Sequence, residues 1–104
     1  MKTTNPVDVL AIARQLFNDE ISGLNSIRDT LNADFIQAVE MLLACKGKVI
    51  VSGMGKSGHI GNKIAATLAS TGTAAFFMHP AEALHGDLGV IESKDLLLAI
   101  SYSG

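Results

Sequence analysis

The sequence predicts a layered α/β fold in which helices cover a parallel β-sheet. Stretches with apolar residues at helical spacing alternate along the chain with short apolar runs. The runs at 49–51 and 96–100 are continuous rather than alternating, as in strands that are buried on both faces of a parallel sheet. Each connection between such strands should cross over with a right-handed turn. We therefore expect one small domain with about three strands.

The composition narrows the possible partners. Of 104 residues, 48% are hydrophobic and 17% are charged, which is enough apolar material for a core. The net charge of −2 gives no broad positive field for nucleic acid or an anionic membrane, so any anion must be bound locally. No apolar run approaches the roughly 18 residues of a membrane span, and the first residues are polar. The sequence predicts a cytoplasmic protein.

Residues 1–47 are predicted to form two helices. Asn5 and Pro6, followed by Asp8, are typical of a helix start. Asn32 is suited to cap a second helix, and Gly47 is predicted to end it in the left-handed conformation. The single cysteine, Cys45, is predicted to be a small buried hydrophobe within that helix. The first helix has an apolar stripe made by Leu10, Ala13, Phe17, Ile21, Leu24, Ile27 and Leu31, and the second by Phe35, Val39, Leu42 and Leu43.

Residues 48–104 are predicted to form a strand–loop–helix unit and two further strands. The strand at 49–51 enters the glycine loop 53–58, after which helical spacing resumes at Ile60. Small residues should let this helix lie close to the sheet; these are Gly61, Ala65, Ala66 and Ala69. The segment 74–78 is a second strand candidate, a short helix is expected around 82–84, and 96–100 is the third strand.

The glycine loop Gly53-Met54-Gly55-Lys56-Ser57-Gly58 matches G-x-G-x-x-G, a pattern in which backbone amides approach an anion at a helix start. A dinucleotide site would need an acidic residue near the end of the second strand, where Met78 and His79 stand. A nucleoside triphosphate loop would need glycine at Ile50. A small phosphorylated ligand needs only the amides, hydroxyl and cation of Gly55, Ser57, Gly58 and Lys56. A tight turn that binds nothing stays an alternative.

A second hydroxyl-rich loop follows the third strand. Ser101 and Ser103 stand at alternate positions before Gly104. If the first and third strands are neighbours, these hydroxyls should lie at the same edge of the sheet as the glycine loop, where open α/β sheets bind ligands. Alone, this short pattern is more often an ordinary turn.

Two histidines between these loops are candidates for acid–base chemistry. His85 beside Gly86 and Asp87 is the stronger candidate, because imidazole titrates near neutral pH and a carboxylate can orient it. One alternative is a turn histidine without function. The other is a metal bound by His79 and His85, although a third ligand is not evident. His59 could face the ligand, but an exposed helix position explains it as well. Glu82 is either a partner of the helix dipole or an active-site carboxylate.

At these residues the chain resembles the sugar isomerase domain family, and within it the arabinose 5-phosphate isomerases. The resemblance covers the last two-thirds of the chain, and its motifs together are highly specific. The amino-terminal helices match in pattern only. The motifs are Lys48 to Gly61, Ser70-Thr71-Gly72-Thr73, His79-Pro80, His85-Gly86-Asp87-Leu88-Gly89 and Ser101-Tyr102-Ser103-Gly104.

The resemblance implies a three-layer α-β-α domain whose five-stranded parallel sheet has flavodoxin-like order. It also implies interconversion of D-ribulose 5-phosphate and D-arabinose 5-phosphate through an enediolate, without a cofactor or a metal, on the route to the Kdo sugar of lipopolysaccharide. By position, Ser57, Ser101 and Ser103 would contact the phosphate. Lys56 would stabilise the oxyanion, and His85 would open the cyclic sugar or act as the base.

The main departure from the family is the extent of the chain. The family's further catalytic carboxylates and histidine follow the second loop, so we expect this to be the amino-terminal part of such a domain, with the third strand at an open edge. Pairing with another copy, or with a partner that supplies the rest, is a natural expectation. A phosphosugar sensor and a non-catalytic module are the alternatives, although a sensor would not need Lys56 and His85.

Overall fold

The protein is seen in a computed structural model that describes residues 5–102 and, at Asp87 and Leu88, the backbone alone. Backbone contacts divide the chain into two compact units, Met1–Ile36 and Gln37–Gly104. The first contains a long helix. The second contains the sheet and the candidate site.

The long helix is α1, Pro6–Thr30, and it confirms the predicted first helix. The side chain of Asn5 accepts a hydrogen bond from the amide of Val7 at 2.9 Å, which caps the helix as the sequence indicated. Asp8 lies in the first turn, where a negative charge is favourable. None of the residues of α1 is buried, so its apolar stripe lies exposed.

The second helix, α2, runs over Ala33–Ala44, and the Asn32 side chain caps it by accepting from the Asp34 amide at 3.0 Å. The expectation that Gly47 ends α2 in the left-handed conformation is wrong. Gly47 lies beyond the helix and does not have a positive φ. Its amide donates to the Lys94 carbonyl at 3.2 Å, and a Cβ would lie 2.8 Å from that oxygen. The glycine therefore allows close passage of two backbones.

The end of α2 contacts the core through part of its predicted apolar stripe. Leu42 packs against the core of the second unit, whereas Leu43 is 81% exposed. Cys45 is half-buried and packs against the same core, but it follows α2 rather than lying within it. The interpretation of Cys45 as a packing residue therefore agrees with its position, and its predicted helical placement is wrong.

The sheet has three parallel strands in the order β2-β1-β3: β1 is Val49–Gly53, β2 is Ala75–Phe77 and β3 is Leu96–Ile100. This order is the beginning of the flavodoxin-like order 2-1-3. The central strand begins with Val49, Ile50 and Val51, which are all fully buried, as a continuous apolar run predicts. The third strand, β3, is an edge strand of the described sheet, as expected.

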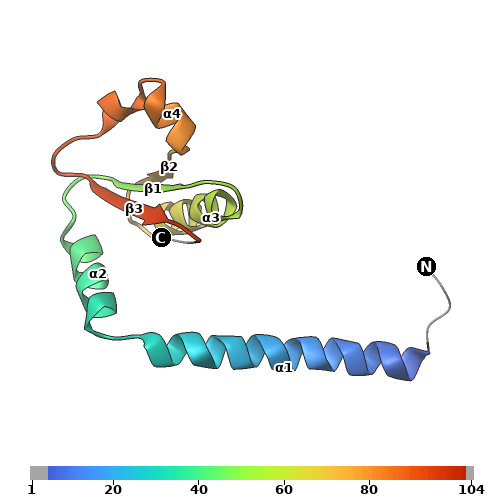
Figure 1. The fold of residues 1–104 in the computed structure, drawn as a ribbon. Coiled ribbons are helices and arrows are strands. Elements are labelled where there is room, and N and C mark those ends of the chain that lie inside the picture. The colour runs from blue at the N-terminus through green and yellow to red at the C-terminus, as the bar shows by residue number, and fades with distance from the viewer. Residues whose placement is uncertain (1–4, 103–104) are drawn as a thin grey trace. The chain divides into compact units, whose positions relative to one another are not determined.

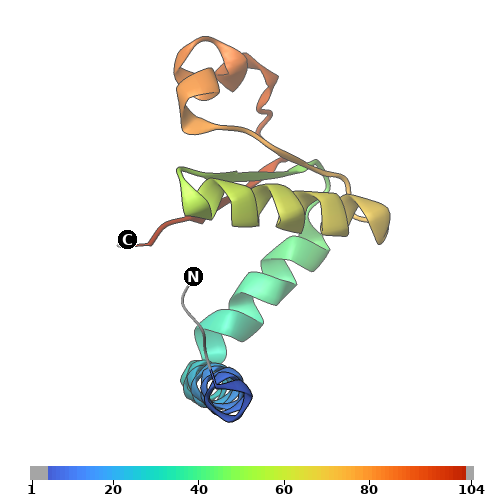
Figure 2. The same ribbon diagram turned by 90° about the vertical axis from the view of Figure 1, so that its right-hand side faces the viewer.

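Helices cover the two faces of the sheet (Figures 1 and 2). On one face, Val49 and Val51 form the core with Ala65 of α3, which runs over Lys56–Ser70. On the other face, Ile50 and Ser52 line a cavity of about 380 Å³ together with residues of α4, Pro80–Leu84. The arrangement is a three-layer α-β-α fold, which confirms the predicted fold class.

Close approach of α3 to the sheet depends on two of the four small residues that the sequence singled out. Gly61 and Ala65 are buried, and a Cβ on Gly61 would lie 3.2 Å from Phe77 and Val51. Ala66 and Ala69 are exposed, so their predicted role in close packing is wrong. The short 3₁₀ helix η1, Asp87–Val90, has no counterpart among the predicted elements.

Among the described residues, none of the helices combines the length and the apolar content needed to cross a membrane. This holds for α1, which is the longest described helix at 25 residues.

A carboxylate joins the beginnings of β1 and β3. Asp95 accepts hydrogen bonds from the backbone amide of Lys48 at 2.7 Å and from that of Glu92 at 2.8 Å. The Lys48 ammonium lies 3.2 Å from the second carboxylate oxygen. The backbone hydrogen bond from Lys48 makes the largest contribution, and together these interactions lower the pKa of Asp95 to about 2. The contact fixes the register that brings the far ends of both strands to the candidate site.

We expect Asp95→Asn to destabilise the protein and to remove part of its acid sensitivity. The pKa of Asp95 is lower in the folded protein than the ordinary value of about 3.9, so the unfolded chain takes up this proton first. Its stabilising effect is therefore complete above about pH 4 and is lost as the pH falls towards about 2. Urea unfolding across this pH range measures the effect.

Asp19→Asn is the matched control, because Asp19 on α1 is exposed and asparagine can keep its hydrogen bond from Gln15. The free energy of unfolding of the wild type and of this control should fall together as the pH is lowered. That of Asp95→Asn should fall less. If the free energy of unfolding depended on pH equally in all three chains, the assigned role of Asp95 would be contradicted.

Candidate functional site

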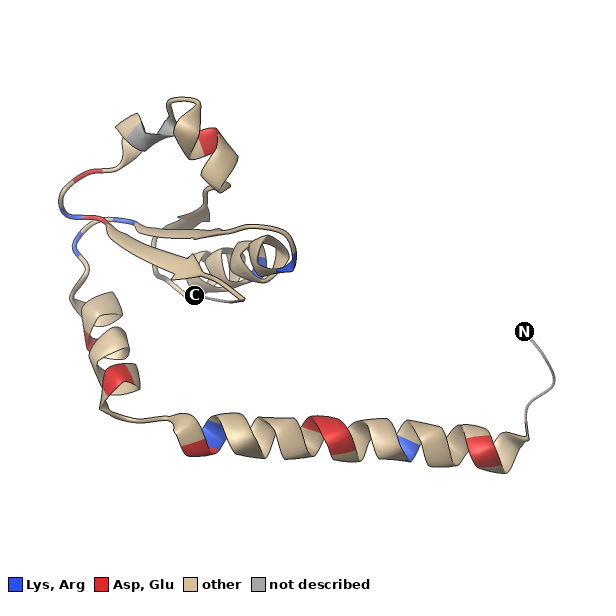
Figure 3. Ribbon diagram, viewed as in Figure 1, with Lys and Arg blue, Asp and Glu red and all other residues tan. Residues whose placement is uncertain are grey.

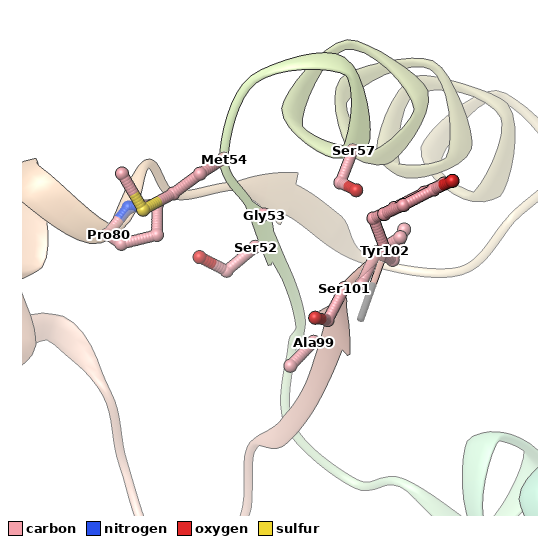
Figure 4. A pocket seen from close by; sticks show the side chains of 9 residues that line it. Ser52, Gly53, Met54, Ser57, Pro80, Ala99, Ser101 and Tyr102 are labelled. Atoms are coloured by element: carbon pink, nitrogen blue, oxygen red, sulfur yellow. The ribbon is translucent and has the colours of Figure 1, made fainter. Parts of the chain in front are cut away.

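A pocket of about 350 Å³ opens where β1 and β3 end (Figure 4). Its walls come from the end of β1, the first turn of α3, the first residue of α4 and the end of β3. The lining residues are Ser52, Gly53, Met54, Ser57, Pro80, Ala99, Ile100, Ser101 and Tyr102. The pocket therefore lies at the carboxyl end of the sheet, where open α/β sheets bind ligands.

Strand pairing brings the two loops to this pocket. β1 and β3 are parallel neighbours, and Gly53 stands opposite Ile100 in their register. Ser101 follows directly and lies in the pocket wall with Ser57 from the other loop. The first and third strands are therefore neighbours, as a site shared by both loops requires.

The glycine loop has a shape that other residues would disturb. Gly55 caps α3 with φ of +59°, a backbone conformation that L side chains rarely adopt. Gly58 is buried, and a Cβ there would lie 2.8 Å from the Gly53 carbonyl oxygen. These glycines let the chain turn from β1 into α3 within two residues, so the first turn of α3 lies directly beside the end of β1.

The electrostatics of α3 favour an anion at this end. The first amides of a helix lack partners within the helix, and the helix dipole is positive there. The helix contains Lys56 and Lys63 and no acidic residue, as the blue segments without red on α3 show in Figure 3. None of the described residues that line the pocket is Asp, Glu, Lys or Arg. The pocket thus offers amides and hydroxyls rather than a charged clamp.

Of the other predicted site residues, those that the structure describes do not line this pocket. Gly55 and Gly58 line a neighbouring hollow of about 320 Å³ with His59, Asn62, Phe77 and His79. Lys56 is exposed at the first position of α3. His85 is exposed and follows the last residue of α4. Ser103 and Gly104 lie outside the described residues. The predicted roles of Lys56 and His85 stay predictions.

Several lining residues were not predicted as site residues. Ser52 is the one hydroxyl within β1, and it stands opposite Ala99 in the register, where a small side chain leaves room. A polar residue that ends an apolar strand run just before a glycine loop is a signal that could have found it. Met54 lies in the glycine loop that the sequence singled out, but Pro80 and Tyr102 carry no such signal, because their place depends on how α4 and the end of β3 fold back.

Metal ligands do not gather in the described part of the chain. Among the side chains that the structure describes, which do not include that of Asp87, no group of three His, Cys, Asp or Glu is placed to hold a metal ion.

The fold and the site define an α/β domain with a pocket of amides and hydroxyls at the carboxyl end of its parallel sheet. Residues 42–104 match the SIS domain family. The chain belongs to this family of sugar isomerase domains.

Curated relatives and a solved structure agree with the family. The chain is 60% identical over 96 residues to arabinose 5-phosphate isomerase GutQ of Escherichia coli (strain K12), a match that covers 92% of this chain and 30% of that protein. It is 56% identical over 98 residues to arabinose 5-phosphate isomerase KdsD of Yersinia pestis, covering 94% and 30%. The chain thus spans less than a third of the length of these relatives.

Its backbone is similar to the solved structure of E. coli CFT073 c3406 in complex with arabinose 5-phosphate, with a TM-score of 0.86 and 39% sequence identity. That match covers 94% of this chain and 52% of the other. The similarity therefore extends over almost all of the described fold.

Proposed function

We propose that this chain is the amino-terminal part of an arabinose 5-phosphate isomerase, which interconverts D-ribulose 5-phosphate and D-arabinose 5-phosphate. The observation that carries the proposal is the pocket shared by the loops after β1 and β3, which is lined by both Ser57 and Ser101. Relatives that are 60% and 56% identical bear this activity in their names. The similar solved structure is a complex with arabinose 5-phosphate.

The phosphate would lie at the first turn of α3. The amides of Gly58 and His59 donate to the Gly55 carbonyl at 3.0 and 3.3 Å, whereas those of Lys56 and Ser57 precede the first hydrogen bonds of the helix and can donate to an anion. The Ser57 hydroxyl can donate a further hydrogen bond. Ser101 and, by the family resemblance, Ser103 would complete the phosphate site from the other loop. The pocket volume of about 350 Å³ is in the range that small-molecule sites occupy.

The isomerisation moves a proton between C1 and C2 of the open-chain sugar through an enediolate. Such a step needs a base and a group that stabilises the developing oxyanion. We assign the second role to Lys56, next to Ser57 on α3, and ring opening or proton transfer to His85. The described pocket wall contains no carboxylate, so the family's further carboxylates would complete this chemistry.

Binding without turnover is the second candidate function. It is favoured by the same observation, because the described lining residues can hold a phosphate but include none of the usual catalytic bases, His, Asp, Glu or Lys. The chain would then serve as a phosphosugar-binding module.

Deuterium uptake separates the two functions. In D₂O, an enediolate exchanges the proton at C2 of arabinose 5-phosphate, which proton NMR follows directly. In the complete isomerase that contains this chain and the further carboxylates, we expect exchange. Lys56→Ala and His85→Ala should lower the exchange rate at least about a hundredfold and change phosphate affinity less than about threefold, as general acid–base roles predict. Ligand binding without exchange would support the binding module, and absence of both would contradict both functions.

We also propose that the chain self-associates, acts in the cytoplasm and serves the synthesis of Kdo for lipopolysaccharide. The support for self-association is the exposed apolar stripe of α1, since contiguous exposed apolar surface usually marks an interaction site. Sedimentation velocity over increasing concentrations should show a species larger than a monomer. A monomer at all concentrations would count against it.

A further inference from the structure

His79 caps the first turn of α4 with both its side chain and its backbone carbonyl. Its Nδ1 accepts a hydrogen bond from the Ala81 amide at 3.1 Å. Its carbonyl oxygen accepts from the amides of Glu82 at 2.9 Å and Ala83 at 3.2 Å. Pro80, the first residue of α4, has no N–H group. One residue therefore satisfies every backbone donor in the first turn of this helix.

The side-chain hydrogen bond fixes the protonation of the imidazole. Nδ1 can accept only when it carries no proton, so the ring is neutral and its proton lies on Nε2. Histidine is not among the preferred capping residues, which are Ser, Thr, Asp and Asn. His79 also lines the hollow that contains His59 and Asn62, so it lies between α4 and the start of α3.

The cap matters because α4 has little else to determine its direction. A helix of five residues is far too short to be stable alone, and α4 packs chiefly on η1. Its first residue, Pro80, forms part of the pocket wall. Its end is followed by His85, whose amide donates to the Glu82 carbonyl at 3.1 Å. A change in the direction of α4 would move both residues.

We propose that His79 is a positioning residue of the candidate site: its neutral imidazole caps α4 through Nδ1 and thereby holds Pro80 in the pocket wall and His85 at the far end of the helix. The cap itself does not depend on the proposed function. Its effect on sugar phosphate binding rests on that function.

Imidazole ¹⁵N NMR and amide exchange of the unliganded chain test the cap. We expect an unprotonated Nδ1 and a protonated Nε2 at His79 at neutral pH. In His79→Ala, the Ala81 amide should exchange about fivefold faster, while His79→Asn, which keeps an acceptor, should stay within about twofold of the wild type. His59→Ala is the matched control, because His59 lines the same hollow without capping, and it should leave Ala81 unchanged.

Titration with arabinose 5-phosphate tests the consequence. His79→Ala should bind it about fivefold more weakly, and His79→Asn should restore most of the affinity. A proton on Nδ1, or unchanged Ala81 exchange in His79→Ala, would overturn the proposal. So would an asparagine variant that behaves like the alanine variant. If His79→Ala does not fold, the tautomer of His79 in the wild type and the Ala81 exchange of His79→Asn still test the proposed cap. A confirmed cap in a wild-type chain that binds no sugar phosphate would refute the proposed function alone.

Discussion

Gly58→Ala is expected to destabilise the protein by about 1–3 kcal/mol, the usual cost of forcing an extra methyl group into a packed site. The added Cβ would lie 2.8 Å from the Gly53 carbonyl oxygen, which belongs to backbone and cannot turn away. The end of β1 and the first turn of α3 would have to separate, which would also open the pocket. Urea unfolding measures the stability, and titration with arabinose 5-phosphate measures the effect on the pocket.

Gly23→Ala provides the matched control. Gly23 lies inside α1, where a Cβ would meet nothing within 4 Å. Alanine there should stabilise the helix by about 0.5–1 kcal/mol, because glycine loses more conformational freedom in a helix. Replacing glycine by alanine should thus lower the free energy of unfolding at position 58 and raise it at position 23. A Gly58→Ala chain as stable as the wild type would show that β1 and α3 do not approach so closely.

Ser57→Ala is expected to weaken arabinose 5-phosphate binding by roughly ten- to a hundredfold, because a hydrogen bond to a charged group contributes about 1.5–3 kcal/mol. Ser57 lies in the first turn of α3 and in the pocket wall, where its hydroxyl would reach the phosphate. Protein stability should change little, since the side chain is only half-buried. Isothermal titration calorimetry at fixed ionic strength measures the affinity.

Ser70→Ala tests whether this effect is local. Ser70 ends the same helix, and its hydroxyl donates to the Thr67 carbonyl at 2.9 Å. This variant removes the same atom at the other end of α3 and should bind like the wild type. An affinity of Ser57→Ala within about twofold of the Ser70→Ala affinity would exclude a direct phosphate contact by Ser57.

Much of the sheet could be predicted because its signals are local. A continuous run of β-branched residues at Val49 to Val51 indicates a buried strand, and the run Leu96 to Ile100 gave the third strand with its observed bounds. The edge at which both loops meet followed from the geometry of parallel sheets. The part of the site formed by Ser57 and Ser101 was therefore accessible from the sequence.

The rest depended on contacts between distant segments. Gly47 carries the signal of a helix end, yet its place is set by Lys94, far along the chain. The contact of Asp95 with Lys48 is likewise invisible to periodicity. Pro80 reaches the pocket only because α4 begins there, directly after its cap His79, and lies over the sheet face. No local pattern specifies such a position.

Amide NMR of the ¹⁵N-labelled wild-type chain, titrated with arabinose 5-phosphate and separately with free arabinose, tests the central claim most directly. The claim is that the pocket between the loops after β1 and β3 binds the phosphate of a sugar. We predict shifts at Gly55 to Gly58 and at Ser101 that require the phosphate and that are absent with arabinose. Shifts confined to other surfaces, equal shifts with both sugars, or an unchanged spectrum would contradict the account.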